Sequence, residues 1–223
     1  MTFDPIAARQ NMVEAQLKST KVTDDRILHA FASLPRERFI PARARSKRNL
    51  AYIDEDLSIG GGRYLVEPVV LARLIQEAGV THDDTVLVIG PGTGYSAAVL
   101  EYLASQVMAV ESDEELLNEA RANFAHLGLY DIVTSHGDLT GGWHEYAPYD
   151  VILLNGAVSD IPEGIVQQLS PHGRLVTVRR GRPAWQGQGI LMTRHEGRIS
   201  EVPLFDAATP YLPGFEPRPE FVF

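Results

Sequence analysis

The sequence predicts an α/β fold: a doubly wound, mostly parallel seven-stranded sheet with an N-terminal helical extension. Three observations predict it. Between Thr85 and Glu111, two apolar runs flank a glycine-rich turn and a helical segment. Further apolar runs follow at 132–135, 149–155 and 174–178, separated by helical or turn segments. The run YDVILLN is almost continuously apolar, as expected of a strand that helices cover on both faces.

We expect residues 1–66 to form the extension together with a loop bordering the active site, and residues 67–223 to form one compact α/β unit. The Asp-Pro pair at 4–5 is typical of a helix start. Thr23 can cap a second helix, which ends before Pro35.

The segment 36–48 is rich in basic residues. The interpretation we favour is a solvated helical face, and a patch for an anionic partner is the alternative, discounted because the whole chain is acidic. The six residues are Arg36, Arg38, Arg43, Arg45, Lys47 and Arg48.

The segment 51–66, AYIDEDLSIGGGRYLV, is polar, glycine-rich and without clean periodicity, which predicts a long loop. Its glycines at 60–62 allow close backbone approach, so the loop is a candidate wall or lid of the site. Asp54 and Asp56 face either the site or solvent, and both readings stay open. A helix then runs from the Glu-Pro pair at 67–68 to a glycine stop.

The turn after the first strand has glycines at alternate positions, Gly90, Gly92 and Gly94. Glycine lets the backbone turn sharply and approach a ligand closely, because it has no Cβ. Glu111 lies 21 residues beyond Gly90, about the distance at which a βαβ unit places an acid to accept hydrogen bonds from ribose hydroxyls. We therefore expect a nucleoside-bearing cofactor here, with an ordinary glycine-rich turn as the alternative.

Two common nucleotide sites are disfavoured. A dinucleotide fingerprint needs its third glycine one place beyond Gly94, where Tyr95 stands. A phosphate-binding P-loop needs a lysine after the turn, and the chain has no lysine beyond Lys47. The remaining pattern is the Gly-x-Gly-x-Gly turn of methyltransferases that use S-adenosylmethionine, a cofactor with a ribose and an adenine but no phosphate.

Beyond the turn, Ser112 and Glu115 suggest a capping box for a helix that Gly128 ends. Asp138 follows the strand at 132–135, so it can bond an adenine amino group or be a common turn residue. The later segments are expected to be a helix at 161–169, a hairpin of strands 190–193 and 199–205 around Glu196-Gly197, and a proline-rich tail packed down by Tyr211, Phe215, Phe221 and Phe223.

Composition narrows the partners. A net charge of −9 disfavours a broad surface for nucleic acid. The N-terminus has no apolar core of signal-peptide length, and no apolar segment reaches the ~20 residues that span a bilayer, so we expect a cytoplasmic protein without a membrane partner. The seven histidines show no HExxH pattern and there is no cysteine, so no metal site is expected. Nothing in the sequence specifies an oligomeric state.

The pattern also fits one kind of chemistry. Methyl transfer from a sulfonium to a carboxylate needs no general base, since the acceptor is already ionised at neutral pH, and positioning and water exclusion do the catalysis. This agrees with a chain that has no evident catalytic dyad. The acceptor motif expected of an amine methyltransferase after the fourth strand is absent, because Asn155 and the three residues that follow it include neither proline nor an aromatic.

Several segments together carry a more specific signal: MVEAQL (12–17), VTDDRILHAF (22–31), LPRERFIP (34–41), AYIDEDLSIGGG (51–62), VLVIGPGTGYSAAVL (86–100) and PLFDAATPYLPGF (203–215). They resemble the protein-L-isoaspartate O-methyltransferase family over nearly the whole chain. The resemblance implies a Rossmann-like methyltransferase sheet and esterification of the α-carboxylate of isoaspartyl residues, a protein-repair reaction. It also places S-adenosylmethionine at Gly90, Gly92, Gly94, Glu111 and Asp138.

The chain departs from the family's pattern at two places. The family usually has Leu-Glu-Ile-Gly where this chain has Leu-Val-Ile-Gly at 87–90. The family also has Gln-Thr-Ile-Ser, with hydroxyls beside the transferring methyl, where this chain has RYLV at 63–66. Val66 cannot hydrogen-bond an acceptor carboxylate, and one such lost bond could cost about 1.5–3 kcal/mol, roughly ten- to a hundredfold in rate.

Three hypotheses therefore stay open, with Arg63, Tyr64 and Val66 as the candidate catalytic positions. In the first, the protein methylates isoaspartyl residues, and Arg63 or Tyr64 binds the acceptor carboxylate. In the second, the altered loop serves a different peptide or protein carboxylate or another acceptor. In the third, the protein binds S-adenosylmethionine without turnover.

Overall fold

A seven-stranded sheet forms the centre of the computed structural model, which describes residues 3–181 and 187–217. Within these residues the strand order is β5-β4-β3-β6-β7-β8-β9. Strands β3 to β7 are parallel, and β8 and β9 are antiparallel to their neighbours. The strands are β3 (Thr85–Ile89), β4 (Gln106–Glu111), β5 (Ile132–His136), β6 (Tyr149–Val158), β7 (Leu169–Arg180), β8 (Gly187–His195) and β9 (Arg198–Ala207). The predicted fold class is confirmed.

The strand order reverses between β3 and β6, which positions the functional site. From β3 the chain moves outward through β4 and β5, then returns to the other side of β3 as β6. At such a switch point the connections diverge, and the carboxyl ends of the strands border a crevice that binds ligands in open α/β sheets. The turn at 90–94 lies directly at the end of β3.

Alternate side chains of the central strands enter two separate apolar cores. Val86 and Val88 face the larger core, whereas Leu87 and Ile89 face the smaller one. The larger core lies under α3 (Pro68–Ala78), α4 (Tyr95–Glu101) and α5 (Glu114–Leu127). The smaller core is covered by α6 (Glu163–Val166), by the short 3-10 turn η5 (Leu139–Gly141) and by the chain beyond 209. A second 3-10 turn, η6 (His144–Tyr146), has no buried residue.

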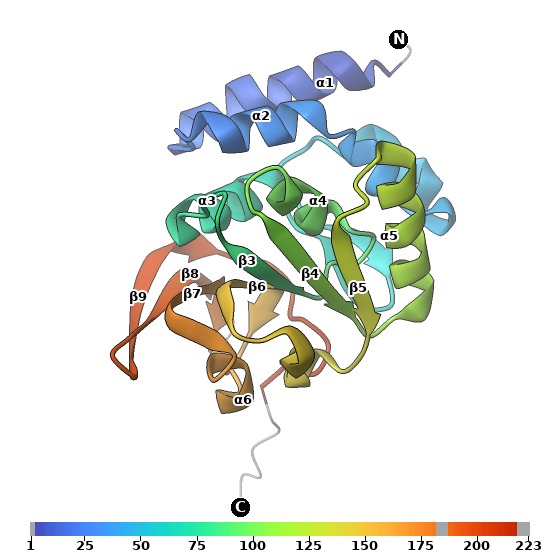
Figure 1. Ribbon diagram of the computed structural model, residues 1–223. Helices are drawn as coiled ribbons and strands as arrows, with labels where there is room; N and C mark the ends of the chain where they lie inside the picture. The colour runs from blue at the N-terminus through green and yellow to red at the C-terminus, as the bar shows by residue number, and fades with distance from the viewer. Residues whose placement is uncertain (1–2, 182–186, 218–223) are drawn as a thin grey trace, which may run out of the picture.

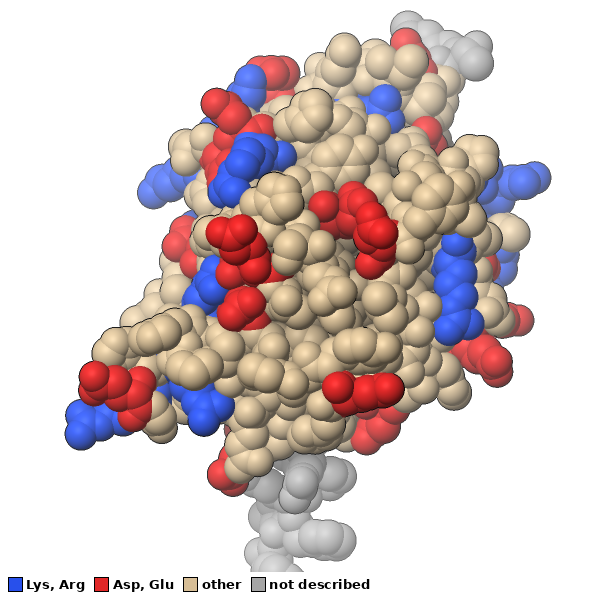
Figure 2. All heavy atoms as spheres, in the orientation of Figure 1, with Lys and Arg blue, Asp and Glu red and all other residues tan. Residues whose placement is uncertain are grey.

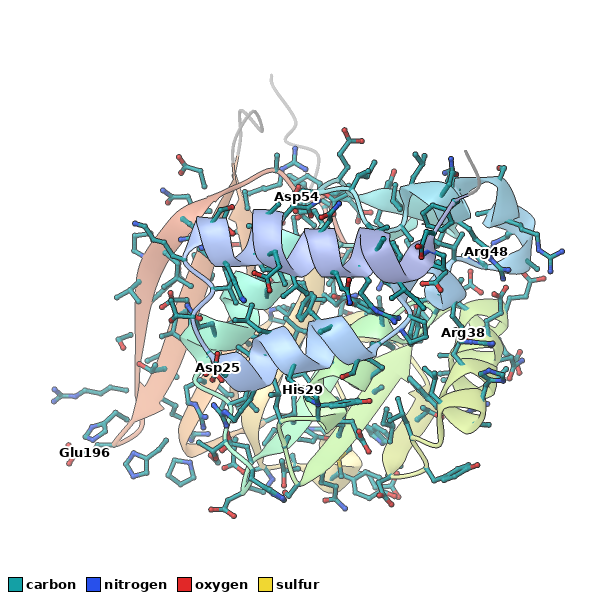
Figure 3. All side chains as sticks on the ribbon, turned by 90° about the horizontal axis from the view of Figure 1, so that it is seen from above. Asp25, His29, Arg38, Arg48, Asp54 and Glu196 are labelled. Carbon is teal, nitrogen blue, oxygen red and sulfur yellow. The ribbon has the colours of Figure 1, made fainter. Side chains whose placement is uncertain are left out.

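The N-terminal extension forms a further layer over α3 and α4 (Figure 1). Helix α1 (Pro5–Asn11) continues as a π-helical segment η1 (Met12–Leu17) and a 3-10 turn η2 (Lys18–Thr20), and α2 (Asp25–Ser33) runs beside it (Figure 3). The buried side chains of the extension belong to the larger apolar core. The boundary at 66 stays a prediction, and both parts share one core.

Between the extension and α3 lie two 3-10 segments, η3 (Arg36–Phe39) and η4 (Ala42–Leu50), and a small hairpin. The hairpin consists of β1 (Leu57–Gly60) and β2 (Arg63–Leu65), which pair antiparallel with a bulge. The predicted loop thus contains two short strands, because its glycines at 60–62 all have positive φ and form the hairpin turn.

Two predicted helix caps were wrong by one residue. Asp113, not Ser112, caps α5, since its carboxylate accepts from Leu116 N at 3.1 Å while Ser112 N donates to Glu111 at 2.9 Å. Asp24, not Thr23, caps α2. In both cases the side chain first proposed precedes an aspartate that has the extended backbone a cap requires.

The C-terminal elements follow the prediction with two differences. The helix expected at 161–169 is limited to Glu163–Val166, because Leu169 already pairs with Tyr149 in the sheet. The β8–β9 hairpin turns at Glu196-Gly197, both with positive φ, and projects from the body at the labelled Glu196 (Figure 3). In the tail, Phe215 is buried and Tyr211 bridges to Ala157, whereas Phe221 and Phe223 lie outside the described residues.

Candidate functional site

The glycine turn connects β3 to α4 and is buried along its whole length. Gly90, Gly92 and Gly94 have φ values of 74°, 60° and 99°. In this backbone region a residue with a side chain would be strained. A Cβ at Gly94 would also lie 2.5 Å from the ring of Phe124 on α5. Gly94 therefore allows α5 to pack against the turn. Gly90 and Gly92 are the two glycines that a ligand could approach closely.

Glu111 ends β4 beside this turn, and its side chain is 0% exposed. One carboxylate oxygen, Oε2, accepts from Gly92 N at 2.8 Å and from Arg63 Nε at 3.3 Å. The other, Oε1, accepts from Ser112 N at 2.9 Å and from Asp113 N at 3.3 Å. The predicted proximity of acid and turn is present, and the chain's own donors already occupy both oxygens.

Arg63 lies over the turn, with a side chain only 2% exposed. Its Nη2 donates to the carbonyl of Gly90, which also accepts from Asn155 Nδ2 at 2.9 Å. A Cβ at Gly90 would collide with this guanidinium and would lie 2.8 Å from Leu212 Cδ2. The space that Gly90 leaves free is therefore occupied by Arg63 of the same chain.

Ile59 covers the next glycine in the same way. A Cβ at Gly92 would lie 2.7 Å from Ile59 Cδ1. Because Ile59 is on β1 and Arg63 on β2, both strands of the hairpin cover the turn. The predicted role of this loop as a wall of the site agrees with the geometry.

Asp138 follows β5, the strand next to β4, at the same edge of the sheet as Glu111. The two segments are joined by a bond from Gly137 N to the Glu111 carbonyl at 3.1 Å. The exposed Asp138 carboxylate accepts from Thr140 N at 3.1 Å and from Thr140 Oγ1 at 2.6 Å. It therefore stabilises a local turn while remaining accessible at this edge.

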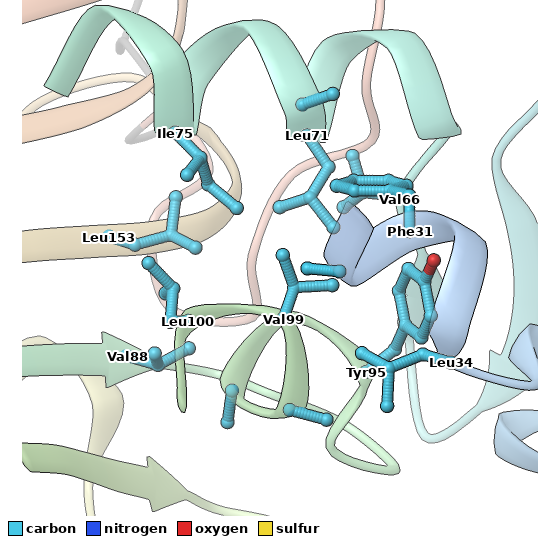
Figure 4. Close-up of a cluster of buried hydrophobic side chains, with 14 of the residues drawn as sticks. Phe31, Leu34, Val66, Leu71, Ile75, Val88, Tyr95, Val99, Leu100 and Leu153 are labelled. Carbon is cyan, nitrogen blue, oxygen red and sulfur yellow. The ribbon is translucent and has the colours of Figure 1, made fainter. Parts of the chain in front are cut away.

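Val66 lies elsewhere, in the apolar core. Its side chain is 4% exposed and packs in a cluster with Phe31, Leu71 and Tyr95, between α2, α3 and α4 (Figure 4). Tyr64 pairs with Ser58 and alternates with the buried Arg63, so it points to the other face of the hairpin. Of the three candidate catalytic positions, the described structure brings only Arg63 to Glu111.

Asp54 and Asp56 hold the start of α3. Asp56 Oδ1 accepts from Glu67 N at 3.1 Å, and Asp54 Oδ1 accepts from Val69 N at 3.0 Å. Figure 3 labels Asp54 at the side of the extension. Burial raises the pKa of Asp56 to about 6, although the Glu67 amide opposes the shift. Burial, together with repulsion from Asp56, raises the pKa of Glu67 to about 7.

Three residues at the turn were missed by the sequence analysis as parts of the site: Ile59, Asn155 and Leu212. Ile59 and Leu212 are ordinary apolar residues, and only the tertiary fold brings them to the glycines. Asn155 had a detectable signal, because it is a polar residue directly after the apolar run 151–154.

Two observations bear on other site types. Within residues 3–181 and 187–217, no group of three or more His, Cys, Asp or Glu side chains could hold a metal ion. Among the same residues, no helix is both long and apolar enough to cross a membrane.

Comparison with known families now identifies the lineage of the chain. The family model described as protein-L-isoaspartate(D-aspartate) O-methyltransferase matches residues 7–187. The chain belongs to this family. The resemblance noted in the sequence is thereby confirmed, and the assignment covers the extension, the hairpin, the glycine turn and most of the sheet.

Curated relatives support the same assignment. A protein-L-isoaspartate O-methyltransferase of Koribacter versatilis is 37% identical over 89% of this chain and 87% of its own length. The protein of that name from Methylorubrum extorquens is 40% identical over 87% of this chain and 82% of its own. That from Picosynechococcus is 41% identical over 78% of this chain and 77% of its own.

Solved structures agree in fold. A protein-L-isoaspartate O-methyltransferase superposes with a TM-score of 0.78 at 26% identity, covering 92% of this chain and 66% of that chain. A Plasmodium falciparum structure, described as a putative member in complex with S-adenosyl-L-homocysteine, gives a TM-score of 0.74 at 18% identity, covering 93% of this chain and 97% of that chain. The latter likeness shows the shared fold.

The polar groups of this site fit the family's cofactor, S-adenosylmethionine, and residues of the same chain contact these groups in the described conformation. The glycine turn, the Glu111 carboxylate and the accessible Asp138 supply what a ribose and an adenine need. In this conformation, however, Arg63, Ile59 and Leu212 lie in contact with the turn, and Glu111 is bonded to Arg63. Arg63 thus occupies a Glu111 oxygen and covers the Gly90 carbonyl in this conformation.

Proposed function

We propose that this protein is an S-adenosylmethionine-dependent carboxyl methyltransferase that esterifies isoaspartyl residues of damaged proteins. The observation that carries the proposal is a buried carboxylate, Glu111, bonded to the glycine turn at the switch point of the sheet, in a chain that belongs to this family over residues 7–187. The relatives named above carry this activity in their names.

In this proposal, Gly90, Gly92, Gly94, Glu111 and Asp138 hold the cofactor. The cofactor supplies an electrophilic methyl group on a sulfonium. The chain's residues bind, orient and exclude water, because an ionised carboxylate attacks without a general base. Arg63 is the candidate for binding the acceptor carboxylate, since a guanidinium forms charge-assisted, bidentate hydrogen bonds with carboxylates. Tyr64 is the second candidate.

The acceptor in this proposal is a peptide or protein, and the protein works in the cytoplasm. Nucleic acid and membranes are not partners. On the face that Figure 2 shows, acidic and basic side chains are interspersed rather than gathered in a basic patch for nucleic acid. The net charge of −9 has the same implication.

A second candidate function is S-adenosylmethionine binding without isoaspartyl methylation, or methylation of another acceptor. Two observations favour it: Val66 is buried in an apolar cluster, and Arg63 is bonded to Glu111 rather than free to meet an acceptor. Val66 is the position at which the family's Gln-Thr-Ile-Ser pattern has its serine, so this loop has no hydroxyl there.

The test is methyl transfer from labelled S-adenosylmethionine to an isoaspartyl peptide, with the matching aspartyl peptide as the control. Ester formed on the isoaspartyl peptide alone supports the first candidate. Cofactor binding by calorimetry without ester supports the second, and labelling of any acceptor in a lysate then distinguishes changed specificity from lost turnover. Absence of cofactor binding would contradict both.

A further inference from the structure

We propose that Arg63 is a built-in competitor of the cofactor, and that the β1–β2 hairpin closes the glycine turn until the cofactor displaces it. This inference rests on the proposed function, because it concerns access of S-adenosylmethionine to the same turn. It adds a regulatory role for a residue at which the chain departs from the family's glutamine.

Arg63 contacts the same groups that a ribose would use. The Glu111 carboxylate is the expected acceptor for ribose hydroxyls, and Arg63 Nε occupies one of its oxygens at 3.3 Å. The same guanidinium donates through Nη2 to the Gly90 carbonyl. One side chain therefore contacts both the acid and the backbone on which a cofactor would bind.

The Arg63–Glu111 pair is buried. Arg63 and Glu111 are 2% and 0% exposed, so the pair is removed from water. A buried guanidinium needs a carboxylate and carbonyl oxygens around it, and this site provides both. A bound cofactor would take the Glu111 oxygen from Arg63, so the guanidinium has to leave before the ribose binds.

Side chains of η4 attach the hairpin to the rest of the chain. Arg43 Nε donates to the Ile59 carbonyl at 2.9 Å, and its Nη1 pairs with Glu115 on α5. Lys47 Nζ donates to the Ser58 carbonyl at 3.0 Å. Two cations of η4 thus hold β1 over the turn, and we call Arg43 and Lys47 the latch.

The latch gives a role to part of the basic segment 36–48. The favoured sequence interpretation, a solvated face, is wrong for Arg36, which is buried, whereas Arg43 is exposed and Lys47 partly exposed while both donate to backbone carbonyls of the hairpin. Arg38 also contacts the chain, at His126 Nε2, with a separation of 2.7 Å. Figure 3 places Arg38 and Arg48 at the same end of the molecule.

The consequence is a cofactor affinity set by the open fraction of the hairpin. When only the open state binds, the apparent Kd equals the intrinsic Kd divided by the open fraction, so a hairpin open about 10% of the time weakens binding about tenfold. Weakening Arg63 or the latch raises the open fraction and tightens binding without any new contact to the cofactor.

The experiment measures binding of S-adenosylmethionine and S-adenosylhomocysteine to the full chain by calorimetry. The variants are Arg63→Gln, which installs the family's residue, and Arg45→Gln, a matched charge change on the exposed Arg45 of η4. We expect Arg63→Gln to bind about tenfold tighter or more and Arg45→Gln to bind like wild type.

A second variant keeps the test decisive if Arg63→Gln does not fold. Arg43→Gln combined with Lys47→Gln removes the latch, leaves Glu111 and the glycine turn untouched, and should also tighten binding. In wild type, hydrogen exchange at amides 57–65 should speed up when the cofactor is added, because the hairpin is displaced.

The outcomes separate this inference from the proposed function. Wild type that binds the cofactor with the same affinity as Arg63→Gln and the latch variant overturns the competitor role and leaves the function standing. Weaker binding by Arg63→Gln also overturns it, since Arg63 would then assist the cofactor. If neither wild type nor any variant binds the cofactor, both proposals are overturned.

Discussion

Arg36 donates from Nη2 to the carbonyl of Val66 at 2.7 Å and thereby joins η3 to the segment before α3. Its Nε donates to the Ala51 carbonyl at 2.7 Å, and its guanidinium lies 4.7 Å from the centre of the Tyr95 ring. The side chain is fully buried, and burial lowers its pKa. A cation at this depth fixes both ends of the loop that contains the hairpin.

Arg36→Ala should therefore destabilise the protein strongly. The substitution removes two charge-assisted hydrogen bonds and leaves two buried carbonyls without their donor, which together cost about 3 kcal/mol or more. Urea unfolding should show a lower midpoint, with Arg45→Ala as the control for a change of the same charge at an exposed position. A loss below about 1 kcal/mol would contradict the structural role.

Val66→Ser tests whether the missing hydroxyl limits the reaction. The side chain packs among Phe31, Leu71 and Tyr95, so the serine should lower the free energy of unfolding by about 2 kcal/mol through lost apolar contact and a buried hydroxyl. Activity is then assayed on an isoaspartyl peptide well below the melting temperature. A gain in rate shows that the hydroxyl was limiting, and no gain with cofactor binding intact shows that the loop works differently.

The sheet, its strand order and the glycine turn beside Glu111 follow from local patterns, because apolar periodicity and alternate glycines reflect the chain's own geometry. The contacts of Arg63 do not follow from local patterns. Its sequence neighbours predict a loop, and only the hairpin turn at 60–62 brings it back over Gly90. Val66 was placed near the chemistry by resemblance, whereas its burial depends on helices distant in sequence.

The corrected cap of α5 gives a direct test. Asp113 accepts from Leu116 N at 3.1 Å, so Asp113→Ala should cost about 1 kcal/mol of stability. Ser112→Ala removes only a long hydroxyl bond, 3.4 Å to Glu111, and should cost less than about 0.5 kcal/mol. Chemical unfolding of both variants checks the order. A larger loss for Ser112→Ala would restore the capping box predicted from the sequence.

The contribution of two carboxyl groups at the start of α3 to stability should decrease as pH rises from about 4 to 7. Asp56 has its pKa raised to about 6 and Glu67 to about 7, both chiefly by burial, against about 4 in an unfolded chain. In this range the folded protein binds more protons at these groups than the unfolded chain does. Stability rises with pH only where the unfolded state binds more protons than the folded state. The stability that this pair contributes therefore falls as pH rises.

Asp56→Asn isolates that contribution. The amide oxygen can still accept from Glu67 N, the charge is removed, and Glu67 loses its main repulsive neighbour, so the decline between pH 4 and 7 should become shallower. Urea unfolding at several pH values measures the slope, with Glu77→Gln, an exposed carboxylate of the same helix, as the matched control. An equal slope in Asp56→Asn and in wild type would mean that these carboxyl groups are ionised alike in the folded and unfolded states.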